Sequence, residues 1–372
     1  MKTYGIRYGL IGLVLICQGA CLYAQGAARD SGAGPRIVRV SRLVLPIVYY
    51  TPETRWAAGA AGLYAFRIRG AQDSLRPSQI QPGVAVTQER QVLLYLPYRL
   101  WWGRRGYTAF GEWGYYRYTY AYFGIGPDTA GRTRETYDVT FPRVRVQGLR
   151  QVWPGWYLGG LVSGDWYKMR SVTPGGHLAD PVRAVPGRQG GAVTSLGLIV
   201  VYDTRDQLFF PARGWYLEGR WQAGGRVTGS DYRFRRMTLD LSGYRRVVRG
   251  HVLAANVYAD LAGGEVPFQA MGLLGGSRRM RGYFEGSFRD KVLLTVQAEY
   301  RIPLFWRIGG DVFGALGTVA PRLGAVSAAQ VRGSGGAGLR LTLDKAQHIN
   351  IRLDYGWGRD TRGVYLTVGE AF

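Results

Sequence analysis

The sequence has very little cysteine and no long apolar run beyond its N-terminus. Its two cysteines, Cys17 and Cys21, both lie within the first 24 residues. Once those residues are removed, the mature chain can form neither a disulfide bond nor a thiolate metal site. No later stretch approaches the ~20 apolar residues that a membrane-spanning helix needs. Disulfide-stapled secreted domains and helical membrane proteins are therefore both excluded.

Histidine is equally scarce, and its placement argues against an enzyme. The three histidines, His177, His251 and His348, are expected in one long loop and at two strand starts. They are too scattered for a metal site or for a Ser-His pair. Carboxylates such as Asp240 and Asp260 fit internal ion pairs better than acid and base catalysis. We therefore expect no catalytic residue, no metal and no cofactor.

Residues 1–24 have the features of an export signal that is removed. Lys2 and Arg7 precede an apolar core over 9–16, and Ala24 ends a plausible cleavage site. Lipid attachment at Cys21 is the alternative, which the polar Gln18 disfavours. Residues 25–42 then form a short flexible periplasmic segment, and 43–372 form the folded domain.

Basic residues dominate the charge, and nearly all of them are arginine. The formal net charge is +23, and lysine occurs only at positions 2, 168, 291 and 345. Nucleic acid is the first partner to consider, but the arginines are spread among alternating apolar residues instead of clustering, and the chain is exported. A barrel whose lumen and outer loops carry the charge explains them better, since guanidinium groups pair with carboxylates and with anionic lipid headgroups.

Strict alternation of apolar and polar residues predicts membrane-spanning strands. Near the C-terminus, Leu353, Tyr355 and Trp357 alternate with Arg352 and Asp354. Aromatic residues make up 13% of the chain, as is typical of strands that end at membrane interfaces. A soluble β-sandwich would also alternate, but with fewer Trp and Tyr near strand ends. We therefore predict an all-β fold, a transmembrane antiparallel barrel.

The number of alternating segments predicts about 16 strands, an even number as bacterial outer-membrane barrels require. The third is expected over Gln79–Val86 and the last over Gly363–Phe372. With the N-terminus in the periplasm, the long connections fall outside, among them 123–135, 169–191 and 262–290. The segment 202–214 becomes a periplasmic turn, in which Asp and Pro supply local hydrogen bonds and a fixed φ. Its motif residues are Asp203, Arg205, Asp206, Pro211 and Gly214.

The glycine-rich loop 275–291 carries the tripeptide Arg281-Gly282-Tyr283 between two predicted strands. This loop, together with the Asp-x-Arg-Asp…Phe-Pro-x-x-Gly turn, resembles the BamA/TamA superfamily of outer-membrane proteins, the bacterial surface antigen family. The resemblance covers about residues 43–372 and implies that the loop folds into the barrel lumen. It also implies that the arginine is held there by acidic residues on the two strands that follow.

Carried onto this sequence, the resemblance pairs Arg281 with Glu299 on the first of those strands. The second strand departs from the family pattern, because Ala315 stands where the family has an aspartate. Asp311 lies on the same face and can take its place. Since a buried guanidinium without a carboxylate costs several kcal/mol, we expect Arg281 near Glu299 or Asp311. The alternative is a mobile loop with Arg281 in solvent.

The C-terminus ends in an aromatic residue, Phe372. With Gly363, Leu366 and Val368 it is similar to the C-terminal signal by which the outer-membrane assembly machinery recognises barrels during biogenesis, through strand addition. The alternative is an ordinary strand with an interfacial aromatic residue. Both interpretations place the protein in the outer membrane, in contact with lipids that include lipopolysaccharide.

Members of that family that assemble or translocate proteins carry periplasmic modules ahead of the barrel, and residues 25–42 are too few for one. We therefore expect a stand-alone barrel. Two functions stay open. One is assistance to insertion or translocation of polypeptide or lipid. The substrate would pass through a weak contact between the first and last strands near Pro46, and a separate periplasmic partner would take the place of the modules. The other is a plugged structural barrel or a passive pore.

Overall fold

The computed structural model describes residues 41–51, 54–68, 78–103, 106–129, 134–207, 210–248, 250–344 and 349–372. The predicted export signal and the segment 25–40 lie outside these residues. The described chain is almost entirely antiparallel β-structure, and none of its helices is long and apolar enough to cross a membrane.

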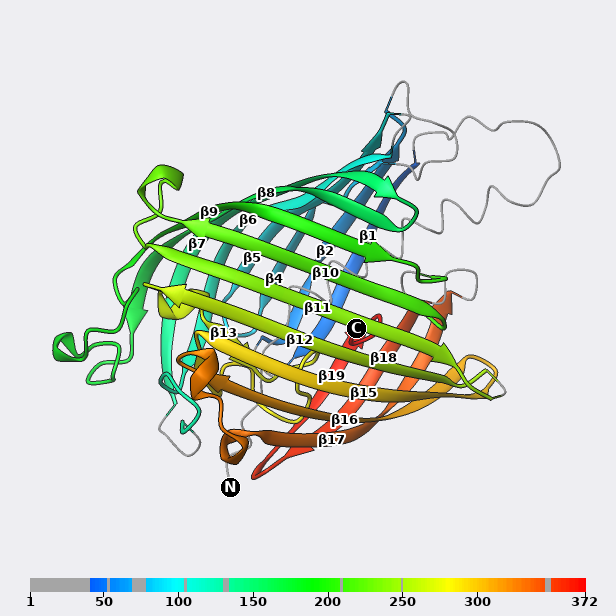
Figure 1. Ribbon diagram of the computed structural model, residues 1–372. Coiled ribbons are helices and arrows are strands. Elements are labelled where there is room, and N and C mark those ends of the chain that lie inside the picture. Colours follow the sequence, from blue (N-terminus) through cyan, green and yellow to red (C-terminus); the bar gives the residue numbers. More distant parts are fainter. Residues whose placement is uncertain are drawn as a thin grey trace.

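The strands follow one another around a closed wall, each paired with its neighbour in sequence (Figure 1). β3 and β4 lie end to end between β2 and β5 and together occupy one position in the wall. The 17 strands of the sheet therefore correspond to 16 membrane-spanning segments, as predicted. The strands are β1 (Ser41–Thr51), β2 (Arg55–Phe66), β3 (Ser78–Ile80), β4 (Gly83–Thr87), β5 (Val92–Trp102), β6 (Tyr107–Tyr122), β7 (Glu135–Trp153), β8 (Trp156–Val172), β9 (Gly190–Asp203), β10 (Gly214–Gly224), β11 (Phe234–Arg246), β12 (Val252–Gly264), β15 (Val292–Phe305), β16 (Ile308–Ala320), β17 (Arg332–Asp344), β18 (Ile349–Gly358) and β19 (Thr361–Val368).

The break between β3 and β4 corrects the single strand predicted over Gln79–Val86. It falls at Pro82, which has no N–H to donate to the ladder. Gly62 of β2 donates instead to the Pro82 carbonyl at 2.7 Å. The wall therefore stays continuous, although its regular hydrogen bonding is interrupted.

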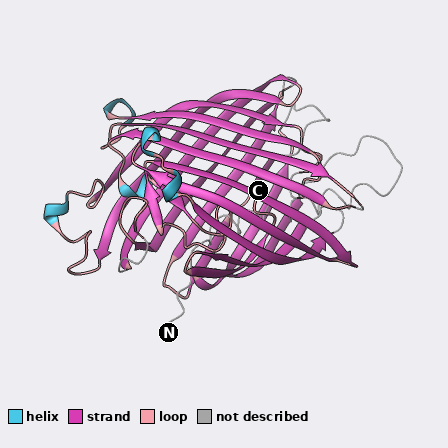
Figure 2. Cartoon of the chain, turned by 60° about the horizontal axis from the view of Figure 1, so that its bottom comes forward, coloured by secondary structure: helices cyan, strands magenta, loops and turns pink. Residues whose placement is uncertain are grey.

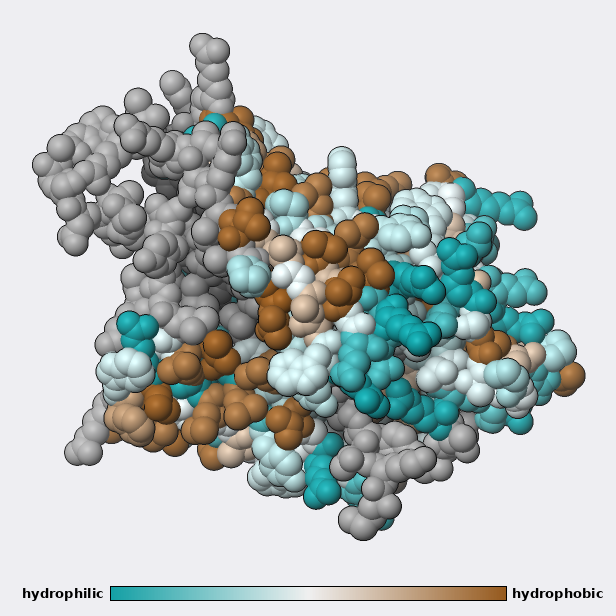
Figure 3. All heavy atoms as spheres, turned by 180° about the vertical axis from the view of Figure 1, so that it is seen from behind, coloured by the Kyte–Doolittle hydropathy of each residue, from teal (hydrophilic) through white to brown (hydrophobic). Residues whose placement is uncertain are grey.

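The two faces of the wall differ as the alternation predicts. On β18, Leu353, Tyr355 and Trp357 are 44 to 51% exposed on the outside, whereas Arg352 and Asp354 are at most 1% exposed inside. Apolar side chains form a broad patch on the outside, while polar ones gather toward one end of the barrel (Figure 3). This arrangement suits a membrane, because hydrocarbon solvates the outer face.

The two ends of the barrel also differ. The short 3₁₀ helices all lie at one end (Figure 2), in the connections β8–β9, β10–β11, β12–β15 and β16–β17. They are η1 (Pro181–Arg183), η2 (Arg226–Thr228), η3 (Phe268–Ala270), η4 (Leu323–Ala325) and η5 (Ala328–Gln330). The opposite end has short turns such as β7–β8 and β15–β16. Long loops mark the outer end of outer-membrane barrels, so the short turns face the periplasm.

Candidate functional site in the lumen and at the closing strands

A cluster of buried charges lies on the inner face of β15–β18. Alternation places these side chains inward, and pairing of the strands in register brings them side by side. One further arginine comes from the loop before β15 and one carboxylate from the C-terminus. We call this set the lumen charge cluster; its members are Arg281, Glu299, Arg301, Asp311, Arg340, Arg352, Asp354 and Glu370, and no side chain among them is more than 3% exposed.

Arg281 reaches this cluster from the loop between β12 and β15. Its Nη2 lies 2.5 Å from Glu299 Oε2, and its Nη1 lies 2.7 Å from Asp354 Oδ2 and 3.6 Å from Asp311 Oδ2. The guanidinium carbon also lies 3.4 Å from the centre of the Phe313 ring. The loop arginine thus contacts both acids considered from the sequence, and a third on β18.

The other arginines complete the charge balance. Glu299 also accepts from Arg301 at 2.8 Å and from Arg340 at 2.7 Å. Arg340 contacts Asp311 and bonds Glu370 at 2.8 Å, and Arg352 lies 2.9 Å from Asp354. Burying a charge is costly unless opposite charges and hydrogen bonds surround it. The four arginines of the cluster balance its four carboxylates, and each carboxylate has an arginine within 4 Å.

The loop backbone docks on β18 and β19 beside the cluster. Gly282 has a φ of +103° and donates its N–H to the Tyr365 hydroxyl at 2.9 Å. A Cβ at Gly282 would lie 2.6 Å from the Trp357 backbone, closer than any real contact. The Tyr283 hydroxyl accepts from the Arg359 N–H at 2.9 Å. The second residue of the tripeptide therefore has to be glycine.

The same loop also contacts the opposite part of the wall. Arg289, in the short strand β14 (Phe288–Asp290) that pairs with β13 (Gly272–Leu274), donates to the Ala121 carbonyl of β6 at 3.1 Å. The Arg289 carbonyl accepts from Gly126 at 2.8 Å, and Phe284 packs edge-on against Phe123. The loop is thus fixed on two sides of the barrel.

Charged side chains are not the only lining of the lumen. The inner face of β6 and β7 carries a buried aromatic cluster, onto which Phe268 and Met271 of the β12–β15 loop pack. Its members on these strands include Tyr116, Tyr118, Tyr122, Tyr137 and Phe141. Tyrosine can line a lumen in this way because its ring packs while its hydroxyl still bonds, as Tyr116 does to Glu112.

The predicted turn at 203–214 joins β9 to β10 at the short-turn end. Arg205 pairs with Asp203 at 2.8 Å, and Asp206 accepts from the backbone N–H groups of residues 212 and 213 at 2.9 and 3.2 Å. Gly214 has a φ of +104°, and the Pro211 carbonyl accepts from Arg301 at 3.4 Å. Through Arg301, the turn contacts the lumen charge cluster.

The C-terminus differs from the predicted strand 363–372. β19 ends at Val368, so Phe372 lies beyond the strand. The reason is Glu370, which turns inward and bonds Arg340 at 2.8 Å and Asn350 at 2.9 Å. The Phe372 carbonyl accepts from Arg301 at 3.2 Å. Gly363 lies buried on the inner face of β19, and recognition of these residues by an assembly machine stays a prediction.

The pairing that closes the barrel, between β1 and β19, is the shortest in the described wall; we call it the seam. β1 pairs with β2 along its whole length, from Ser41–Ala65 to Thr51–Arg55. With β19, the part of β1 that the structure describes pairs at one position, Tyr50–Leu366. Pro46 lies within β1 and offers no hydrogen-bond donor.

The histidines do not come together in the described chain. His177 lies in the β8–β9 loop, and His251 Nδ1 lies 2.9 Å from the Tyr300 hydroxyl. His348 is outside the described residues. Among the residues that the structure describes, no group of His, Cys, Asp and Glu side chains is arranged to hold a metal ion.

Comparison with known proteins finds one matching family and several similar structures. The model of the Omp85 superfamily domain matches residues 184–372. BamA from Haemophilus ducreyi lacking POTRA domains 1–3 is similar in structure, with a TM-score of 0.62 and 14% identity over 89% of this chain and 70% of that one.

Two CdiB structures are also similar, each with a TM-score of 0.56. CdiB from Acinetobacter baumannii has 10% identity over 88% of this chain, and CdiB from Escherichia coli has 14% over 91%. The chain spans 59% and 62% of their respective lengths. At these identities the likeness concerns the fold. No curated protein matches the chain by sequence.

Proposed function

This chain belongs to the Omp85 superfamily and is an outer-membrane β-barrel, and from that premise we propose that it assists insertion or translocation of polypeptide or lipid at the outer membrane. The observation that carries the proposal is the seam, at which the described residues of β1 and β19 pair at one position, Tyr50–Leu366. An unpaired strand edge can accept another strand by β-augmentation. In this proposal the barrel provides a path and an edge, and no bond is made or broken.

The strands next to the seam favour opening there. Pro46 in β1, Pro82 between β3 and β4, and Pro97 in β5 each remove a backbone donor. On the β19 side of the seam, the wall is held by the buried lumen charge cluster of β15–β18 and by the docked loop. A distortion of the wall therefore costs less from β1 to β5 than from β15 to β19.

The filled lumen supports a lateral path over a central one. The loop before β15 contacts both β18–β19 and β6, and aromatic side chains occupy the space beside it. A substrate entering through the seam would not need to displace these contacts. A periplasmic partner that delivers the substrate stays a prediction, which a pull-down from the envelope tests.

A disulfide across the seam is expected to abolish the activity. Tyr50→Cys with Leu366→Cys joins two directly paired residues, whose Cα atoms are close enough for a disulfide. In proteoliposomes, the oxidised variant should lose at least about tenfold in the rate at which an unfolded outer-membrane barrel is inserted or a labelled lipid is transferred, with recovery upon reduction.

The matched control is Tyr355→Cys with Val364→Cys, which bridges the well-paired strands β18 and β19 and is outward-facing like the seam. It should leave both rates unchanged. Equal rates for the oxidised seam variant and the wild type would contradict the proposal.

A plugged structural barrel is the second candidate, favoured by the double attachment of the loop inside the lumen. Single-channel conductance separates it from a passive pore, because a plugged barrel carries almost no ion current. The plugged barrel and the proposed function differ in the liposome assay, where the plugged barrel shows neither transfer activity nor an effect of the seam disulfide.

A further inference from the structure

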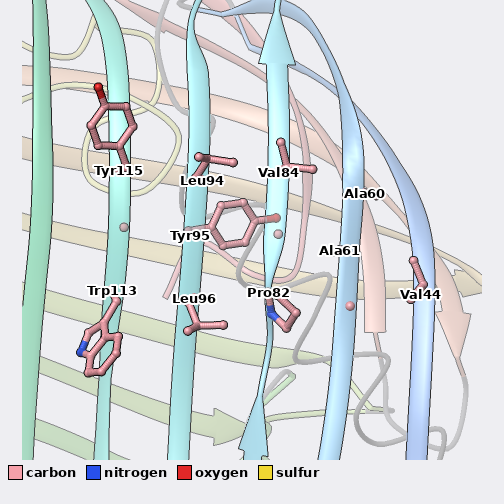
Figure 4. A pocket seen from close by; sticks show the side chains of 13 residues that line it. Val44, Ala60, Ala61, Pro82, Val84, Leu94, Tyr95, Leu96, Trp113 and Tyr115 are labelled. Carbon is pink, nitrogen blue, oxygen red and sulfur yellow. The ribbon is translucent and has the colours of Figure 1, made fainter.

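An apolar groove opens on the outer face of the wall beside the seam, across β1 to β6 (Figure 4). Its volume is about 610 Å³, within the ~300–1,000 Å³ of small-molecule sites. Val44, Val84, Leu94 and Trp113 line it and are exposed on the membrane side. Tyr95 belongs to the inner face, where its ring covers Gly83.

Small residues and the strand break explain why the wall is hollow here. Ala60 and Gly62 face outward on β2, between the larger side chains of Val44 and Val84. Pro82 follows at the interruption between β3 and β4. A lipid-facing wall is normally covered by large apolar side chains, so this strip leaves room for an apolar chain to lie against the protein.

Arginine side chains lie just above the groove, at its end toward the long loops. Arg117 follows Tyr115 by two residues on β6, so it faces outward about 7 Å further along. Arg90 lies in the turn between β4 and β5, and both side chains are exposed. The acid in this turn, Glu89, is paired with Arg55 at 2.7 Å. Among the described residues of this rim, positive charges outnumber negative ones.

We propose that this groove is a binding site for lipopolysaccharide, with an acyl chain lying along Ala60, Gly62 and Leu94 and a phosphate bound by Arg90 and Arg117. The end of the barrel with long loops faces the cell exterior, so the arginines lie at the outer-leaflet headgroups and the groove lies in the hydrocarbon below. Apolar surface below and positive charge above match a phosphorylated, acylated lipid in both place and chemistry.

The site does not depend on the proposed assembly role, because it lies on the outside of the wall. It is tested with the full-length protein in nanodiscs of phosphatidylcholine, titrated with fluorescent lipopolysaccharide. Arg90→Gln with Arg117→Gln should weaken binding by roughly 25-fold, about fivefold for each arginine near the membrane surface. Ala60→Trp, which fills the groove without touching the lumen, should also weaken it by about tenfold or more.

The control is Arg233→Gln with Arg235→Gln, which removes the same charge from the rim at β11. The β11 variant should bind lipopolysaccharide like the wild type. Enzymatically dephosphorylated lipopolysaccharide should bind weakly, and with equal affinity, to the wild type and to the Arg90 and Arg117 variant. Heat-modifiable migration in gels verifies that each variant is folded. Wild-type affinity in the Arg90 and Arg117 variant or in Ala60→Trp, or an equal loss in the β11 control, would overturn the proposal.

Discussion

Replacing Arg281 with alanine is expected to lower the free energy of unfolding by about 3–5 kcal/mol, the usual cost of removing one partner from a buried ion pair. The substitution leaves Glu299, Asp354 and Asp311 with one positive charge fewer in a site that excludes water. The loop should also become sensitive to protease. Unfolding in guanidinium chloride, followed by tryptophan fluorescence, measures the first effect, and limited trypsin digestion measures the second.

Two further variants separate the buried contact from a general charge effect. Arg359→Ala removes a largely exposed arginine beside the same loop and should change stability by no more than about 0.5 kcal/mol. Arg281→Lys should rescue only in part, because an ammonium cannot span Glu299 and Asp354 as the planar guanidinium does. If Arg281→Ala matched the wild type in both assays, the loop arginine would be in solvent.

Gly282→Ala is expected to detach the tip of the loop even though it adds only one methyl group. The residue has a φ of +103°, and the added Cβ would lie 2.6 Å from the Trp357 backbone. The loop must move away, which breaks the bond to Tyr365 and draws Arg281 from its acids. We expect the free energy of unfolding to fall by at least about 2 kcal/mol. Trypsin should cleave within 278–281 at least about tenfold faster than in the wild type.

Gly324→Ala is the matched control for this variant. Gly324 lies in the outer loop between β16 and β17, and a Cβ there meets nothing within 4 Å. Its stability should stay within about 0.5 kcal/mol of the wild type. Equal digestion patterns for the two glycine variants would show that Gly282 is not held against β18.

The sequence predicts the barrel well, because alternation is a local property. Leu353, Tyr355 and Trp357 face outward and Asp354 inward, and the number of wall crossings is as expected. Two local features were missed. Pro82 interrupts its strand, and the chain leaves β19 after Val368, since Glu370 finds Arg340 inside the lumen. Both depend on partners that a single segment does not reveal.

The lumen site was only partly predictable. The family resemblance pointed to Glu299, but it gave no reason to select Asp354, which lies three strands further along the wall. Which inward side chains meet across several strands depends on the stagger of the closed sheet, and alternation leaves that undetermined. Glycines on the inner face of β18 indicate where the loop packs, because Gly356 and Gly358 leave space for it.

The sequence of β6 gives only an ambiguous indication of the aromatic side chains in the lumen. Tyr116, Tyr118, Tyr120 and Tyr122 recur at every second position and so share one face. The same spacing occurs in strands with an aromatic outer face, and the sequence alone does not say which face is inside. The structure places Tyr116, Tyr118 and Tyr122 in the buried cluster.

Hydrogen exchange of the protein in nanodiscs, followed by mass spectrometry, tests most directly whether backbone hydrogen bonds are less protected at the seam than in the rest of the wall. We predict that backbone amides of 41–51 and 361–368 exchange at least about a hundredfold faster than those of 292–302 and 310–320, where β15 and β16 pair without interruption. Equal protection of the two regions would show that β1 and β19 hold together as firmly as the rest of the wall, and would contradict the account.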